Sequence, residues 1–272
     1  MKSLMLLSQP NTGSTWLAEC IRLASPKLRS RPGDREFFNP AWNWECAIPL
    51  SAFFGGELMS SNQNIARTPP VDEYFDFDEC LKETWDKSDR DFTKETYLAW
   101  QIQATPMQSR FDVIGLVRDW ESSFPPSRGR VKVWYDNIYW SLRRNGKMPD
   151  DYFEWENAWV HTAEARAMIA WQIMRWKLER VFASSSNIIS VWDFESLTLA
   201  TESELRTKFA GIFANCGRPM SALPDPDVLA RIIVHTRNHK GTAQQHARQW
   251  KPAFNLLPKF IASFESRFEE FL

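Results

Sequence analysis

The sequence contains no uninterrupted apolar run approaching the roughly 18 residues that a membrane-spanning helix needs. Its 33 lysines and arginines are balanced by 34 aspartates and glutamates, so it lacks the basic excess typical of nucleic-acid-binding proteins. Its first residues also lack the charged, apolar and cleavage segments of a secretory signal. We therefore expect a cytoplasmic protein with no nucleic-acid partner and no membrane span.

Cysteine is scarce and widely scattered, at Cys20, Cys46, Cys80 and Cys216. No two of these residues have the C-x-x-C spacing of zinc ligands or redox pairs. We interpret the four thiols as reduced and structural, and we expect no metal site.

The length and composition are those of an ordinary globular protein. The 272 residues are 43% hydrophobic and 25% charged, and we expect a single domain over residues 1–272. Short apolar runs at 4–7, 111–117 and 187–192 alternate with segments of helical periodicity. This alternation predicts an α/β fold with a central parallel sheet and helices on both faces.

Two further stretches carry local structural signals. Residues 25–90 are rich in proline, glycine and aromatic side chains, which predicts a loop-rich segment. Its aromatic side chains either line a pocket for an acceptor substrate or anchor the segment to the core. Residues 71–95 mix charges with apolar positions at helical spacing, which predicts a solvated helix. Thr201 and Glu204 have the spacing of a capping box and predict the start of another helix.

The stretch from Leu4 to Arg22 predicts a strand, a loop and a helix. The loop contains Gly13, followed by Ser14 and Thr15 at the start of the helix. Unpaired N–H groups and the positive dipole end make a helix start an anion site, and glycine allows a close approach of the backbone. Taken alone, Ser14 fits a simple helix cap better than an anion site. The loop has no lysine before its hydroxyl residues, which argues against a Walker-type phosphate loop.

The segment PNTGSTWL, residues 10–17, resembles the 5′-phosphosulfate loop of sulfotransferases that use 3′-phosphoadenosine 5′-phosphosulfate (PAPS), usually P-[KR]-[ST]-G-[ST]-T-W-L. Asn11 stands where that family generally carries a lysine or arginine facing the sulfuryl group. The resemblance implies that Trp16 stacks on the adenine. It also implies that the 5′-phosphosulfate is bound by Asn11, Thr12, Gly13, Ser14 and Thr15.

The segment VIGLVRDWESSFPPSR, residues 113–128, resembles the 3′-phosphate motif of the same family. Arg118 follows the apolar run of this segment, and a guanidinium can bind a phosphate through two hydrogen bonds. The resemblance implies that Arg118 and Ser127 hold the 3′-phosphate, with Ser123 as the alternative serine. Taken alone, an arginine after a strand fits a structural role equally well.

Lys94 lies in the run Thr93–Thr96, which occupies the place of the K-T-H run of the cytosolic sulfotransferases. The resemblance implies that Lys94 stabilises charge on the transferring group, although an ordinary salt-bridge role fits it as well. Thr96 stands where those enzymes carry their catalytic histidine. The resemblance therefore gives the proton-accepting role to Glu36 or Asp34, which lie about where other branches of the family place an acidic residue. Taken singly, either residue fits a surface charge in a glycine–proline turn better.

Two further segments match the family in part. Phe194 begins the run FESL, which resembles Y-E-D-L and places Phe194 near the nucleotide. The segment from Arg237 to Lys251 resembles a stretched form of the C-terminal R-K-G-x-x-G-D-W-K motif, with His239 in place of the arginine. It implies that Lys240 and Gly241 close over the 3′-phosphate.

The resemblance as a whole implies a P-loop-like three-layer fold and transfer of a sulfuryl group from PAPS, leaving PAP, without a metal. The acceptor is expected to be a hydroxyl or amine of a small molecule or glycan. Two other functions remain open from the residues. One is a nucleotide kinase-like phosphotransferase, and the other is a non-catalytic protein that binds PAP or another nucleotide.

Overall fold

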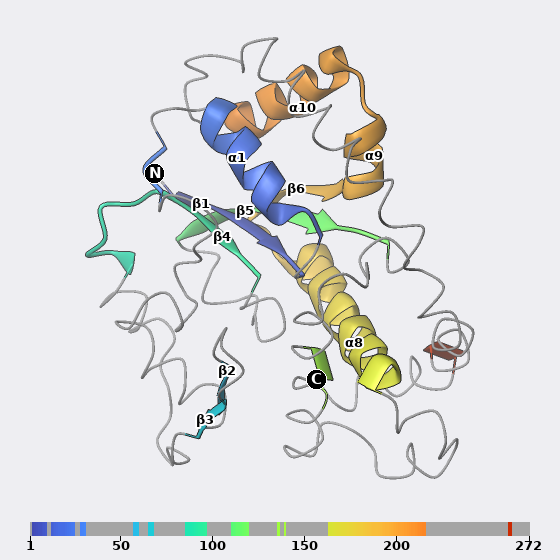
Figure 1. The fold of residues 1–272 in the computed structure, drawn as a ribbon. Coiled ribbons are helices and arrows are strands. Elements are labelled where there is room, and N and C mark those ends of the chain that lie inside the picture. The colour runs from blue at the N-terminus through green and yellow to red at the C-terminus, as the bar shows by residue number, and fades with distance from the viewer. Residues whose placement is uncertain are drawn as a thin grey trace.

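The computed structural model describes residues 2–9, 12–24, 28–30, 57–59, 65–67, 85–96, 110–119, 135–136, 139, 163–215 and 261–262 (Figure 1). The strands are β1 (Ser3–Ser8), β2 (Glu57–Met59), β3 (Ile65–Arg67), β4 (Phe92–Glu95), β5 (Phe111–Val117) and β6 (Ile188–Asp193). The helices are α1 (Ser14–Ala24), α8 (Ala163–Ser184), α9 (Phe194–Leu199) and α10 (Glu202–Asn215).

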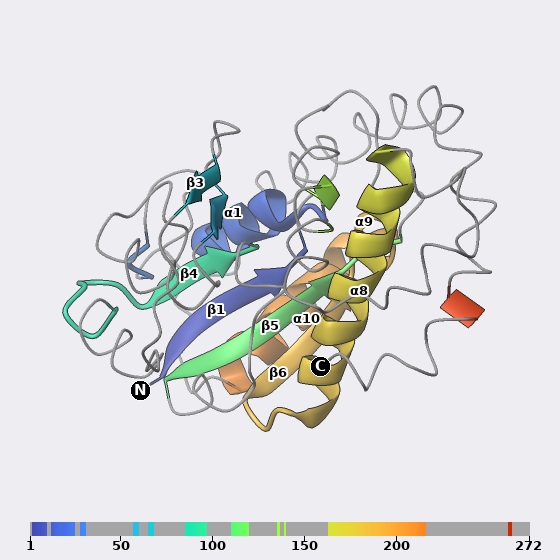
Figure 2. The ribbon, with the colours of Figure 1, turned by 90° about the horizontal axis from the view of Figure 1, so that it is seen from below.

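Four of the strands form a parallel sheet in the order β4-β1-β5-β6 (Figure 2). In this register Leu6 of β1 lies level with Lys94 of β4 and with Ile114 of β5. The short strands β2 and β3 pair antiparallel with each other. The α/β class with a parallel sheet, predicted from the sequence, is confirmed.

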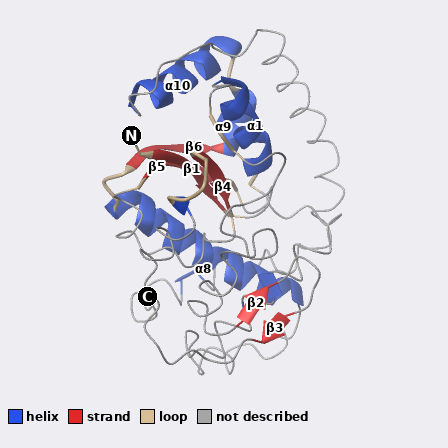
Figure 3. Ribbon diagram, turned by 90° about the vertical axis from the view of Figure 1, so that its left-hand side faces the viewer, coloured by secondary structure: helices blue, strands red, loops and turns tan. Residues whose placement is uncertain are grey.

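Helices cover both faces of the parallel sheet (Figure 3). Helix α8 lies on one face, and α1, α9 and α10 lie on the other. Strand β1 is the reason that both faces need cover, because Leu4, Met5, Leu6 and Leu7 are all fully buried. Successive side chains of a strand point to opposite faces, so a continuous apolar run needs apolar partners on each side.

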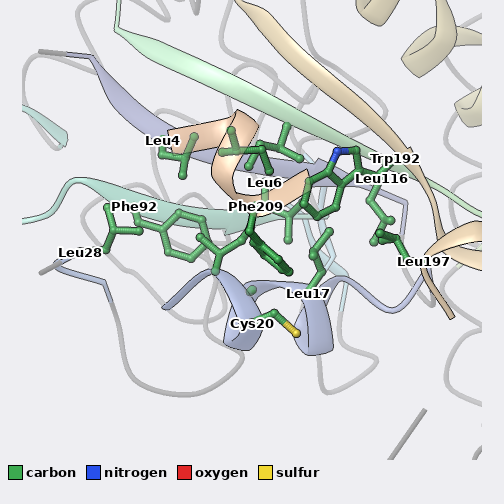
Figure 4. Close-up of a cluster of buried hydrophobic side chains, with 14 of the residues drawn as sticks. Leu4, Leu6, Leu17, Cys20, Leu28, Phe92, Leu116, Trp192, Leu197 and Phe209 are labelled. Atoms are coloured by element: carbon green, nitrogen blue, oxygen red, sulfur yellow. The ribbon is translucent and has the colours of Figure 1, made fainter. Parts of the chain in front are cut away.

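The main core lies between the sheet and the helices α1 and α10 (Figure 4). Leu4 and Leu6 face Leu17 of α1 within one cluster of buried side chains. In the same cluster, the rings of Trp192 and Phe209 meet edge to face with centroids 5.3 Å apart. The apolar stripe that predicted the helix after Gly13 is therefore the face that α1 buries.

On the opposite face, helix α8 packs closely against β5. A Cβ atom built on Gly115 would lie 2.7 Å from Cζ of Phe182 on α8. Any side chain at Gly115 would therefore overlap the Phe182 ring, so this ring packs directly against the backbone of β5. This close packing brings α8 within reach of the residues that follow β1.

The prediction of a solvated helix over residues 71–95 is wrong for its last residues, because Phe92–Glu95 form strand β4. Phe92 is buried in the core beside β1, and Thr93 and Glu95 are buried as well. The charged residues of this stretch gave no strand pattern in the sequence. The strand is stabilised by pairing with β1 rather than by the intrinsic strand propensity of its residues. This strand places Lys94 beside β1.

The capping box at the start of α10 is confirmed. The backbone N–H of Thr201 donates to the Glu204 carboxylate at 2.7 Å, and the N–H of Glu204 donates back to the Thr201 hydroxyl at 3.3 Å. These hydrogen bonds lower the pKa of Glu204 below its usual value.

Cys20 is a free thiol buried on the inner face of α1. Burial raises its pKa, which keeps the thiol protonated and unreactive. The structural role expected for this cysteine agrees with its position. Cys46, Cys80 and Cys216 lie outside the described residues.

Within the part of the chain that the structure describes, no helix is both long enough and apolar enough to cross a membrane. The longest, α8, has 22 residues and carries charged side chains such as Arg166 and Arg175.

Candidate functional site

The carboxyl ends of β1 and β5 lie side by side in the sheet, at Ser8 and Leu116 of their paired register. Helix α1, which follows β1, lies on one face, whereas α8, which precedes β6, lies on the other. In open parallel sheets ligands bind at the carboxyl edge where the connections diverge to opposite faces. The segments around Gly13 and Arg118 both leave the sheet at this edge.

Two buried hydrogen bonds hold the described parts of the loop after β1. The side-chain amide of Gln9 donates to the backbone carbonyl of Trp171 in α8 at 2.8 Å. The hydroxyl of Thr12 donates to the carbonyl of Gln9 at 2.7 Å. The loop is thus tied to the helix on the far face of the sheet as well as to its own strand.

Gly13 forms the transition from loop to helix. Its carbonyl accepts from the N–H of Leu17 at 3.1 Å, which begins the hydrogen-bonding pattern of α1. Its φ of +87° lies in the left-handed region that favours glycine. The first N–H groups of a helix have no carbonyl partner within the helix. Those of α1, beginning at Ser14, are therefore suited to bind an anion.

The ring of Phe194 contacts three of the residues that the sequence singled out. A Cβ atom on Gly13 would lie 2.2 Å from Cε2 of this ring, so the ring rests on the loop backbone. The ring meets Trp16 edge to face with centroids 5.8 Å apart. The guanidinium carbon of Arg118 lies 4.2 Å from its centroid. Phe194 therefore joins the helix start to the arginine.

Arg118 is held in a partly buried environment, with 18% of its side chain exposed. Its Nε lies 3.6 Å from Oε1 of Glu195. Burial lowers the pKa of the Arg118 guanidinium, and the neighbouring Glu195 carboxylate opposes that shift. An arginine side chain stays charged in proteins, so Arg118 provides a fixed positive charge at this edge of the sheet.

The start of α9 places Phe194 and Glu195. Asp193 caps this helix by accepting from the N–H and the hydroxyl of Ser196, both at 2.7 Å. Partial burial alone would raise the pKa of Asp193, but the hydrogen bonds from Ser196, a hydrogen bond with Glu195 and the charge of Arg175 together lower it below its usual value. A charged cap fixes the first turn of α9 against Arg118.

Lys94 reaches the same site from β4. Its Nζ donates to the hydroxyl of Thr15 over 3.4 Å. Lys94 and Leu6 are register partners on neighbouring strands, so the side chain of Lys94 points to the face of the sheet that carries α1. A second positive charge is thereby placed beside the first turn of α1.

The side chain of Glu95, which the sequence did not single out, lies next along β4. It is fully buried and accepts from the Thr93 hydroxyl at 2.6 Å. Strand alternation puts Thr93 and Glu95 on the face opposite Lys94. The alternation of side chains along a strand could have indicated that Glu95 is buried. It applies only once residues 92–95 are assigned to a strand, which the sequence did not predict.

Of the candidate residues, the structure brings together Gly13, Thr15, Trp16, Lys94, Arg118 and Phe194, with Ser14 buried at the start of α1 and Thr12 in the loop. The other candidates lie outside the described residues: Asn11, Asp34, Glu36, Ser127, Lys240 and Gly241. Their roles stay predictions.

Among the residues that the structure describes, no group of three or more His, Cys, Asp and Glu side chains is arranged to hold a metal ion.

Comparison with known protein families, with curated proteins and with solved structures found no match to this chain. The likeness of its motifs to those of the sulfotransferases therefore stays a prediction from the residues.

Proposed function

We propose that the chain is a nucleotide-dependent group-transfer enzyme whose nucleotide binds at the carboxyl edge of β4, β1 and β5. The observation that carries this proposal is the convergence of three anion-binding features from distant parts of the sequence. They are the start of α1, the ammonium of Lys94 and the guanidinium of Arg118. All three lie on the α1 side of the sheet edge.

More narrowly, we propose a sulfotransferase with a P-loop-like three-layer fold that takes its sulfuryl group from PAPS. The support is that the described residues of three segments resembling this family meet at one site. Gly13 contacts Phe194, and Phe194 contacts Arg118. These contacts bring the matched residues together at one carboxyl edge of the sheet.

These positively charged and N–H groups fit a nucleotide that carries one phosphate group at its 5′ position and another at its 3′ position. Backbone N–H groups at Ser14 and Thr15, with the nearby Lys94 ammonium, suit the 5′ end. The guanidinium of Arg118 suits a separate 3′-phosphate. When bound, PAPS supplies a sulfuryl group attached to a phosphate leaving group.

In the proposed reaction, the protein acts chiefly by positioning and electrostatic stabilisation. The helix start holds the 5′ end, and Lys94 stabilises the negative charge that develops beside Thr15. Glu36 or Asp34 accepts the proton of the acceptor hydroxyl or amine, which belongs to a small molecule or glycan. Ser127, Lys240 and Gly241 complete the proposed 3′-phosphate site.

The test of this proposal is a turnover assay that compares two donors. The purified chain is incubated with PAPS and a panel of phenols, amines and sugars, and PAP is measured. A parallel reaction contains ATP, magnesium and the same panel, and ADP is measured. We expect acceptor-dependent PAP formation that is lost in the Ser14→Ala, Arg118→Ala double variant.

Each other outcome points to a different function. ADP formation without PAP formation supports the kinase-like phosphotransferase. Binding of PAP without turnover of either donor across the panel supports the non-catalytic nucleotide-binding protein.

A further inference from the structure

We propose that Glu195 is a positioning residue that holds the Arg118 guanidinium in the orientation in which it binds a phosphate. The proposal rests on the function proposed above for Arg118, and it concerns a residue that the sequence did not single out.

The carboxylate of Glu195 contacts two groups of the chain segment that follows β5. Its Oε1 lies 3.6 Å from Nε of Arg118. Its Oε2 accepts from the backbone N–H of Asp119 at 3.3 Å. One carboxylate thus joins the arginine side chain to the backbone just beyond it, which restricts both.

Phe194, the residue before Glu195, restricts the same guanidinium from another direction. The guanidinium carbon lies 4.2 Å from the centroid of its ring, within the range of a cation–π contact. A free arginine side chain has several rotatable bonds, and ordering it costs conformational free energy. In this chain, two neighbouring residues of α9 order Arg118 before any ligand arrives.

The first turn of α9 is itself fixed, so that Glu195 is presented at a defined place. The Asp193 cap accepts two hydrogen bonds from Ser196.

The backbone of Arg118 is held by α8. Arg175 of α8 donates to the backbone carbonyl of Arg118 over 3.5 Å and pairs with Glu179 at 2.6 Å. The backbone around Arg118 is therefore held from α8 and its side chain from α9.

A carboxylate partner does not prevent an arginine from binding a phosphate. A guanidinium carries five N–H donors, and a carboxylate engages at most two of them. The nearest approach, 3.6 Å between Oε1 of Glu195 and Nε, restrains the guanidinium at its Nε side. We therefore expect the length of the side chain at position 195 to matter more than its charge.

The test compares two nucleotides that differ only in the 3′-phosphate, PAP and AMP, by calorimetric titration. Glu195→Asp keeps the charge but shortens the reach to Nε, and we expect it to weaken PAP binding about tenfold, or about 1.4 kcal/mol, with AMP binding unchanged. Glu195→Gln keeps the reach, because its amide oxygen can lie as close to Nε and can still accept from the N–H of Asp119. We expect it to bind PAP within about threefold of wild type.

Two controls separate this role from a structural one. Glu202→Asp shortens an exposed carboxylate that pairs with Arg206 on α10, and it should leave both affinities unchanged. In an Arg118→Ala background, Glu195→Asp should have no further effect on PAP binding, because the residue acts through Arg118. Thermal unfolding of each variant is recorded alongside.

Equal losses for PAP and AMP would overturn the inference in favour of a purely structural role. Tighter PAP binding by Glu195→Gln would also overturn it, because Glu195 would then compete with the phosphate. If wild type prefers PAP over AMP but Glu195→Asp binds PAP as tightly as wild type, the role proposed for Glu195 is wrong and the proposed function stands. Wild-type protein without a preference for PAP over AMP overturns the proposed function itself.

Discussion

The guanidinium carbon of Arg118 lies 4.2 Å from the centre of the Phe194 ring. This contact follows from the pairing of β5 with β6, in which Val117 lies level with Asp193. The next residue of each parallel strand must then emerge at the same edge of the sheet. Arg118 and Phe194 are therefore neighbours because of strand register, and the loop at Gly13 lies against the same ring.

The first prediction concerns Gly13→Ala. Alanine at φ +87° costs about 1–2 kcal/mol of backbone conformational energy, and its Cβ would also overlap the Phe194 ring. We expect the free energy of unfolding to fall by at least about 2 kcal/mol, measured by urea denaturation.

The clash can be separated from the backbone cost. In a Phe194→Ala background the ring is gone, so Gly13→Ala should lower the free energy of unfolding by only about 1–2 kcal/mol. Strictly additive effects of the two substitutions would show that Phe194 does not rest on Gly13.

The second prediction concerns Gln9→Leu. Leucine has a similar size but cannot donate to the buried carbonyl of Trp171. We expect a loss of about 1 kcal/mol in the free energy of unfolding and weaker nucleotide binding, because the loop loses its tie to α8. Unchanged calorimetric affinity for PAP would mean that this hydrogen bond does not position the loop.

The third prediction concerns Lys94→Met. The variant keeps the length of the side chain but removes the positive charge beside Thr15. We expect the rate of acceptor-dependent PAP release to fall on the order of 100-fold, because the charge acts in the transition state. The affinity for PAP should fall less than the rate, because PAP carries the 5′-phosphate near Lys94 but no sulfuryl group.

Lys208→Met is the matched control, since Lys208 is exposed on α10. It should leave both the rate and the affinity unchanged. An equal loss of affinity and rate in Lys94→Met would assign Lys94 to ground-state binding instead.

The fourth prediction concerns the pH dependence of the cap at Asp193. Its pKa is lower in the folded protein than the usual value near 3.9, so the cap stabilises the protein above that pH. This stabilisation is lost as the pH falls through the lowered pKa. We expect Asp193→Ala to cost about 1 kcal/mol at pH 7 and progressively less as the pH falls below about 3.9.

Asp193→Ser separates capping from charge. Serine can still accept from the backbone N–H of Ser196 but does not titrate in this range. Its difference from wild type should be small at pH 7. A loss for Asp193→Ala that stays constant from pH 7 to pH 2 would contradict the role of the charged cap.

The strand, loop and helix around Gly13 were predictable because their signals are local. A short apolar run predicts β1, glycine predicts the turn, and an apolar stripe predicts α1. The α/β class followed from the alternation of such segments. The capping box at Thr201 was predictable for the same reason, because both of its partners lie within one turn.

The contacts of the site were less predictable because they depend on pairing between distant strands. Strand β4 carries Lys94 and Glu95 among charged neighbours, and only its pairing with β1 makes it a strand. Glu195 is a charged residue in a short helix, and no local pattern in the sequence marks it as a site residue. Its relation to Arg118 follows from the register of β5 and β6, which no local pattern encodes.

The central claim is that Arg118 binds a phosphate at the 3′ position of a nucleotide held at the start of α1. The most direct measurement is calorimetric titration of wild-type and Arg118→Ala protein with PAP and with AMP. We predict that wild type binds PAP at least about tenfold more tightly than AMP, and that Arg118→Ala removes most of this difference while keeping its affinity for AMP. Equal affinities of wild type for the two nucleotides would contradict the claim.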